Sequence, residues 1–80
     1  MKEPILLSPE ITIQVWQSWL RDVEGCELLA PTAPRYASRV LRNRFDSWLW
    51  DYGGSIRLIN KKYHISAYES DATMIVLRWT

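Results

Sequence analysis

The sequence has one cysteine, one histidine and three glycines among its 80 residues. A single cysteine excludes an internal disulfide, and a reducing cytoplasm is the compartment that this composition favours. One histidine and one cysteine do not make the cluster of ligands that a metal site needs, so we expect no metal and no cofactor. The longest apolar runs, ILL and MIVL, are too short to cross a membrane, and no signal peptide is expected.

Aromatic side chains are abundant, in contrast: five tryptophans, four tyrosines and one phenylalanine. Each of these rings buries roughly 150–250 Å² when it enters a core, and disordered chains are poor in such residues. The length fits one small domain, so residues 1–80 are expected to fold as a single unit. Because a core of this size is small, a homo-oligomer is one possible assembly.

The charge is close to balanced overall but unevenly distributed along the chain. Residues 1–34 carry two basic and five acidic side chains (net −3), whereas residues 35–62 carry seven basic and two acidic ones (net +5). Residues 63–80 carry one basic and two acidic side chains (net −1), which leaves a total of +1. A protein with this pattern has no general attraction to nucleic acid or membrane, but its middle third has a local positive surface.

A first amphipathic helix is predicted over residues 9–24. Ser8-Pro9-Glu10 is typical of a helix start, because it combines a hydroxyl cap, a proline in the first turn and an acid near the positive end of the helix dipole. Gly25 is typical of a helix end. The apolar stripe of this helix consists of Val15, Trp16, Trp19, Leu20 and Val23.

A second helix is predicted over residues 34–52, ending at Gly53-Gly54. At about 100° per residue its apolar side chains lie within an arc of roughly 80°. They are Ala37, Leu41, Phe45, Trp48 and Tyr52, with Val40 and Leu49 at the edges. The spacing therefore predicts that Trp48 is buried and Trp50 is exposed. Arg42 and Asp46 are four residues apart and are expected to pair.

After the two glycines, the hydrophobic period changes from that of a helix to that of a strand. Strands are predicted over 55–59 and 62–68, joined by a turn at Asn60-Lys61. Residues 71–79 fit either a short helix capped by Ser70 or Asp71 or a third strand, with the helix slightly favoured. The expected fold class is α+β: two amphipathic helices packed on a small antiparallel hairpin, closed by a short C-terminal helix or third strand.

The C-terminal segment YESDATMIVLRWT resembles the ending of a loose group of short phage-encoded proteins. These end in an acidic pair, Asp-Ala, an apolar segment and Leu-Arg-Trp, which correspond here to Asp71, Ala72, Met74, Leu77, Arg78 and Trp79. Trp48, Leu49 and Gly53 are similar too, so that the resemblance covers roughly residues 46–80. Where the group often has an aromatic residue, this chain has Ile75-Val76. The resemblance implies a phage or prophage origin and implies no activity.

The residue types that carry catalysis are isolated in this sequence. His64 lies on the outward side of a predicted strand, with no serine or cysteine placed by local spacing to use it as a base. Cys26 follows the end of a helix, where the dipole disfavours a thiolate, so a buried or incidental cysteine is expected. Gly53-Gly54 precedes a strand and not a helix, which does not fit a phosphate-binding loop. We expect that the protein is not an enzyme.

The polar side of the second predicted helix is the candidate partner-binding surface. Tryptophan and arginine are enriched at binding hot spots, and arginine makes planar, bidentate contacts. The predicted surface comprises Arg35, Arg39, Arg42, Asn43, Asp46 and Trp50, with Arg57, Lys61 and Lys62 as a possible extension. The competing interpretation is an ordinary solvated helix face, with Trp50 covered by another part of the chain or by a second copy.

Two functions follow from this surface. The first is a small phage-type accessory protein of the host cytoplasm, which binds and modulates, most often by inhibition, a host protein or nucleoprotein complex such as a defence system. The second is direct nucleic-acid binding, with arginines on phosphates and Trp50 stacked on a base. The near-neutral total charge opposes the second function, because dedicated nucleic-acid binders are usually more basic.

Overall fold

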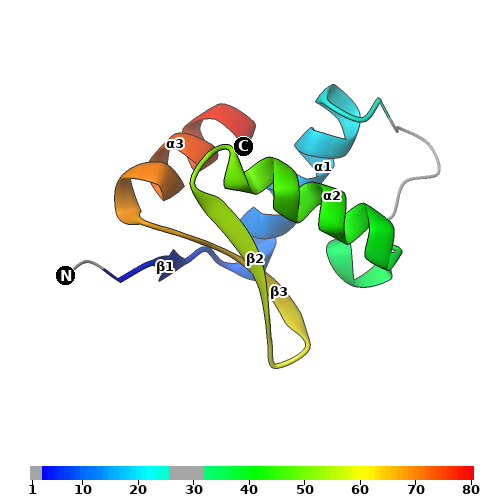
Figure 1. The fold of residues 1–80 in the computed structure, drawn as a ribbon, viewed down its shortest axis with the longest axis horizontal. Coiled ribbons are helices and arrows are strands. Elements are labelled where there is room, and N and C mark those ends of the chain that lie inside the picture. The colour runs from blue at the N-terminus through cyan, green and yellow to red at the C-terminus, as the bar shows by residue number, and fades with distance from the viewer. Residues whose placement is uncertain (1–2, 26–31) are drawn as a thin grey trace.

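The computed structural model of the protein describes residues 3–25 and 32–80. The elements follow in the order β1 (Ile5–Leu6), α1 (Pro9–Asp22), the short 3-10 helix η1 (Pro34–Tyr36), α2 (Arg39–Trp50), β2 (Gly54–Ile59), β3 (Lys62–Ala67) and α3 (Glu69–Trp79). The three strands form an antiparallel sheet in the order β1-β3-β2. The expected α+β class is confirmed, with the helices gathered against the sheet and the β2–β3 turn projecting away from them (Figure 1).

Helix α1 forms where the sequence predicts it. The Ser8 hydroxyl accepts a hydrogen bond from the Ile11 amide at 3.2 Å, and Pro9 occupies the first turn. The helix ends at Asp22, two residues before the predicted end, and Gly25 adopts a left-handed φ of 69°. Its buried residues are Thr12, Val15, Trp16, Trp19 and Leu20, which include four of the five residues of the predicted stripe.

The prediction of one continuous helix over 34–52 is wrong. The chain makes the 3-10 turn η1, becomes extended at Ala37 and Ser38, and only then starts α2 at Arg39. Ser38 explains the interruption, because its hydroxyl accepts a hydrogen bond from the Leu41 amide at 3.2 Å and so caps a new helix. The interruption separates Arg35 from the arginines of α2.

Large rings hold the helices together in the core. Trp16 and Trp19 of α1 contact Phe45 of α2, with ring centroids 5.0 Å and 5.2 Å apart. Trp48 continues the cluster toward α3, where the Trp79 ring lies edge-on at 4.8 Å. Two residues of the predicted stripe of the second helix, Ala37 and Phe45, are buried, and Leu41, Trp48 and Tyr52 are half-buried against the core. Leu49, which was placed at an edge, is fully buried, and Val40 is exposed.

The hairpin agrees with its sequence signals to within one residue. Asn60 and Lys61 have φ values of 50° and 65°, the pair of left-handed residues that a two-residue type I′ turn requires. In the resulting register Ile56 lies opposite Ile65 and Arg57 lies opposite His64. Because successive strand residues point to opposite faces, Ile56, Ile65 and Ala67 face the helices. Ser55, Arg57, His64 and Ser66 lie on the other face.

The N-terminal part of the chain contains a strand that was not predicted, and the C-terminal segment is the helix that the sequence slightly favoured, with an earlier start. The sequence gives no signal for β1, a two-residue strand that pairs Ile5 with Ala67 and Leu6 with Ser66. The segment predicted as a helix or strand from residue 71 is a helix that starts at Glu69, with Tyr68 in the cap position in place of Ser70 or Asp71. No described helix has both the length and the apolar composition that a membrane crossing requires.

Thr12 joins α1 to the middle strand of the sheet. Its hydroxyl donates to the Ser8 carbonyl at 2.9 Å and accepts from the Ile65 amide at 3.0 Å. The Ile65 amide lies just past the short β1, which ends its pairing with β3 at Leu6. The buried hydroxyl therefore satisfies a strand amide that has no strand partner, and it fixes the start of α1 on the sheet.

We expect Thr12→Val to lower the free energy of unfolding by about 1–3 kcal/mol, because the isosteric side chain leaves the Ile65 amide buried without a partner. Urea unfolding followed by circular dichroism measures this loss. Thr73→Val is the matched control, since Thr73 is exposed and its hydroxyl bonds the Glu69 carbonyl, four residues earlier in its own helix. Equal effects of the two substitutions would contradict the structural role of Thr12.

Trp48 and Trp50 give a second test of the fold on the same helix. Trp48→Ala removes a ring packed against Trp19, Phe45, Tyr52 and Trp79, and we expect it to cost about 3–5 kcal/mol. Trp50 is 69% exposed, so Trp50→Ala should change the free energy of unfolding by less than about 0.5 kcal/mol. A larger loss for Trp50 than for Trp48 in the same unfolding assay would show that the helix is rotated differently.

Candidate functional site

Trp50 lies at the C-terminal end of α2 with its indole directed away from the core. It is 69% exposed, whereas the aromatic cluster holds Trp48, two residues earlier on the same helix. The rotation of α2 predicted from the sequence is therefore confirmed for both tryptophans. An exposed indole of this size is unusual enough to make its surroundings the first place to examine for a binding site.

Arg42 does not lie on the surface as predicted. Its guanidinium donates to the carbonyls of Pro34 and Ala37, at 3.3 Å and 2.5 Å, and lies over the Tyr63 ring at 5.6 Å. These contacts hold η1 against α2 and β3. The half-buried Arg42 side chain thus has a structural role.

The expected pair between Arg42 and Asp46 does not form, because both side chains have other partners. Asp46 Oδ1 accepts a hydrogen bond from the Ile56 amide at 2.9 Å. Ile56 belongs to β2, an outer strand of the sheet, and faces α2. Asp46 therefore connects α2 to the edge strand β2. Its partner is the backbone amide of Ile56 and not Arg42, although Arg42 is four residues away on the same helix.

The remaining predicted residues are exposed but lie in different places. Arg35 is on η1, where its guanidinium lies 5.0 Å from the centre of the Tyr36 ring. Arg39 is at the first position of α2, at the opposite end of the helix from Trp50. Asn43 borders a groove between α1 and α2. The six predicted partner-binding residues therefore do not make one continuous surface.

The surroundings of Trp50 form a hollow of about 250 Å³, which we call the Trp50 hollow. Trp50 comes from α2, Arg57 from β2, and Tyr68 from the junction between β3 and α3. Pro4 completes the border, and the lining between these side chains consists of small residues: Gly53, Gly54, Ser55, Ser66 and Ala67. Of the predicted extension, Arg57 lines this hollow, whereas Lys61 and Lys62 do not.

The link between α2 and β2 brings Trp50 beside the sheet. Gly53 has a φ of 80°, which L side chains rarely adopt, and a Cβ at this position would meet Asp71 Oδ2 at 2.5 Å. The chain can therefore turn from α2 into β2 directly beneath the first turn of α3. This tight link lines the Trp50 hollow with backbone and small side chains.

Sequence reasoning missed Tyr68, which is 49% exposed on the border of the Trp50 hollow. A signal was present: residues 64, 66 and 68 alternate with the buried Ile65 and Ala67, so the strand period places Tyr68 on the uncovered face. Pro4 had no such signal, because its position depends on the unpredicted strand β1.

The arginines also differ in whether an acidic side chain pairs with them. Arg44 of α2 forms an ion pair with Glu24 at 2.8 Å. Arg21 pairs with Asp22 at the end of α1, and its hydrogen bond lowers the pKa of that carboxyl. These are the two ion pairs within residues 3–25 and 32–80, so Arg57 has no carboxylate partner there.

His64 has a structural contact. Its Nδ1 lies 3.0 Å from the Leu7 carbonyl oxygen, and because a carbonyl can only accept, this nitrogen carries the hydrogen. The described part of the chain holds no group of three potential metal ligands. The prediction for Cys26 falls outside the described residues.

The Trp50 hollow has side chains that suit recognition: two aromatic rings for an apolar group and one guanidinium for an anionic group.

Removing the Asp46 carboxylate should loosen the edge of the sheet at β2. We expect Asp46→Ala to cost about 1–2 kcal/mol and to speed hydrogen exchange at the Ile56 amide, because that amide loses its acceptor. Asp46→Asn retains an oxygen acceptor and should cost less. Asp51→Ala, which alters an exposed acid just after α2, is the control. Unchanged exchange at Ile56 in Asp46→Ala would contradict this role.

Comparison with protein-family models, with curated proteins and with solved structures gives no match for this chain. The resemblance of its C-terminal part to short phage proteins therefore rests on the quoted residues alone.

Proposed function

We propose that this protein is a non-enzymatic binding module that docks on a larger protein or nucleoprotein complex through the Trp50 hollow. The observation that carries the proposal is Trp50 itself, 69% exposed on a hollow that also presents Tyr68 and Arg57, which has no carboxylate partner among the described residues. Tryptophan, tyrosine and arginine are the residue types that dominate binding hot spots. The small residues of the lining leave room for an apolar side chain of the partner, with a carboxylate near Arg57.

A protein surface fits the hollow better than nucleic acid does, because the cations of the middle third are dispersed. Arg42 is bound to backbone carbonyls and Arg44 to Glu24, which takes both out of any basic patch. Arg35 and Lys62 border a different pocket from the one that Trp50 borders. Nucleic-acid binding draws most of its affinity from several cations that follow a phosphate backbone, and the Trp50 hollow has one.

The resemblance to short phage proteins supplies the setting of the proposal. A phage-encoded accessory protein acts in the cytoplasm of a bacterial host, and a small domain without an active site acts there by covering a surface of a host complex. Inhibition is the expected consequence, since an occupied surface is closed to its usual partner. A bacterial defence complex is one such target. The alternative is a direct nucleic-acid-binding module. The observation in its favour is that Trp50 and Tyr68 offer two rings on which a base can stack.

The test is affinity capture from bacterial host lysate, with the wild-type protein and a Trp50→Ala, Arg57→Glu variant processed side by side. We expect the wild type to retain a defined complex and the variant to lose it, while circular dichroism shows that the variant is folded. Tyr36→Ala is the matched control, because Tyr36 is an exposed aromatic residue (65%) outside the Trp50 hollow. The captured complex should then bind the purified wild-type protein directly.

The other outcomes decide between the hypotheses. Capture that survives the double substitution would exclude the Trp50 hollow as the docking surface. Nucleic acid in place of protein in the capture would favour the alternative, as would binding of labelled single-stranded DNA or RNA that weakens steeply with salt. Loss of capture in Tyr36→Ala as well would show that the loss is not specific to the hollow.

A further inference from the structure

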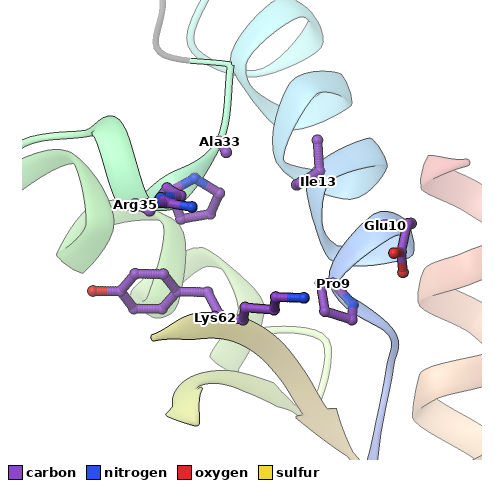
Figure 2. A pocket seen from close by; sticks show the side chains of 8 residues that line it. Pro9, Glu10, Ile13, Ala33, Arg35 and Lys62 are labelled. Carbon is purple, nitrogen blue, oxygen red and sulfur yellow. The ribbon is translucent and has the colours of Figure 1, made fainter. Parts of the chain in front are cut away.

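A second pocket lies between the start of α1, the 3-10 helix η1 and the start of β3, and we call it the η1 pocket. Its volume is about 200 Å³. The walls are apolar and come from Pro9, Ile13, Ala33, Pro34 and Tyr63 (Figure 2). It shares no lining residue with the Trp50 hollow.

The walls of the η1 pocket are fixed by hydrogen bonds from neighbouring elements. The Gln17 amide donates to the Thr32 carbonyl at 3.1 Å, and the Arg42 guanidinium donates to the Pro34 carbonyl at 3.3 Å. Arg42 also lies over the Tyr63 ring, so one side chain holds two walls together. Ser8 caps α1 and thereby fixes Pro9 at its first turn. The pocket is therefore formed before any ligand arrives, which reduces the entropic cost of binding.

Two cations border this apolar space. In Figure 2, Lys62 extends toward Pro9, and Arg35 reaches toward the same gap from η1. Glu10 also belongs to the lining, but its carboxylate lies beyond the first turn of α1, away from both cations. Within the described residues neither Arg35 nor Lys62 has a carboxylate at ion-pair distance. The η1 pocket thus combines apolar walls with two cations and one more distant acid in its lining.

We infer that the η1 pocket binds a small amphipathic carboxylate, with its apolar body between Pro9, Ile13 and Pro34 and its anionic head between Arg35 and Lys62. The apolar walls require an apolar body, since burying a polar one there would leave its groups without partners. A single carboxylate matches two exposed cations at the mouth, one of which is the planar guanidinium of Arg35. The same chemistry occurs in free aryl or branched carboxylic acids and in the C-terminal residue of a polypeptide.

The experiment is a titration of the ¹⁵N-labelled full-length protein, followed by two-dimensional NMR. The probe is 3-phenylpropionate, with 3-phenylpropionamide as the uncharged match and 3-phenylpropylammonium as the reversed charge. We expect the carboxylate to shift the amide signals of Lys62 and Tyr63 in a saturable way and to leave those of Arg57 and Tyr68 in place. The amide and the ammonium should bind at least about threefold more weakly.

Substitutions test the two cations separately from the walls. Lys62→Gln and Arg35→Gln should each weaken binding about three- to tenfold. Lys61→Gln is the matched control, because Lys61 is the adjacent exposed lysine and does not line the pocket. A pair of short peptides that end in phenylalanine, one with a free carboxylate and one amidated, separates the two sources. Binding of the free-carboxylate peptide alone would assign the site to a chain terminus, and binding of the small acid alone would assign it to a free ligand.

Three results would overturn the inference. The first is no saturable shift with any probe. The second is equal binding of 3-phenylpropionate and its amide, which would mean that the cations do not recognise charge. The third is shifts confined to the residues of the Trp50 hollow. None of these readouts uses the captured complex, so a negative titration does not contradict the proposed docking function. A failed capture does not contradict carboxylate binding in the η1 pocket either.

Discussion

The contact of Trp16 and Trp19 with Phe45 is the constraint on which the remaining geometry depends. A domain of this length has room for few large side chains inside, and three rings at centroid distances of 5.0–5.4 Å fill the space between α1 and α2. Once Phe45 faces α1, the rotation of α2 is fixed. That rotation places Trp48 in the same cluster and Trp50 outside it. The exposed indole is therefore a consequence of how the core is filled.

Backbone amides of the sheet impose the second constraint. The sheet has short strands, and two of its amides that have no strand partner find side-chain acceptors: Thr12 from α1 for Ile65 and Asp46 from α2 for Ile56. A buried amide without a partner would cost more than most single contacts in so small a domain contribute. These two bonds attach one helix to each side of the hairpin. They also remove Asp46 from the surface that the sequence suggested.

The basic residues within 35–62 follow one another in the sequence, but tertiary contacts place them in different parts of the structure. Residues 35–62 have a net charge of +5, but the structure places four of their five arginines in different environments. Arg42 holds η1, Arg44 pairs with Glu24, Arg57 borders the Trp50 hollow and Arg35 borders the η1 pocket. The break at Ser38 is the main reason, because it turns the chain before α2 and carries Arg35 away from the helix. One predicted surface thus becomes two smaller sites of different chemistry.

Local patterns in the sequence determined most of the elements. The Ser8-Pro9 start, the helical spacing of the apolar residues, the two glycines and the Asn60-Lys61 turn each act over a few residues, and they place α1, the rotation of α2 and the hairpin correctly. The tertiary structure decided what depends on partners distant in the chain. Strand β1 is stable only because β3 offers it an edge. Helix α3 starts at Glu69 because β3 ends at Ala67, which leaves Tyr68 as the cap residue. Trp50, Arg57 and Tyr68 border one hollow because the sheet brings their elements together. Hydrogen bonds and ring contacts between remote residues have no signature in local spacing, so the hollow and the pocket could not be predicted from the sequence by itself.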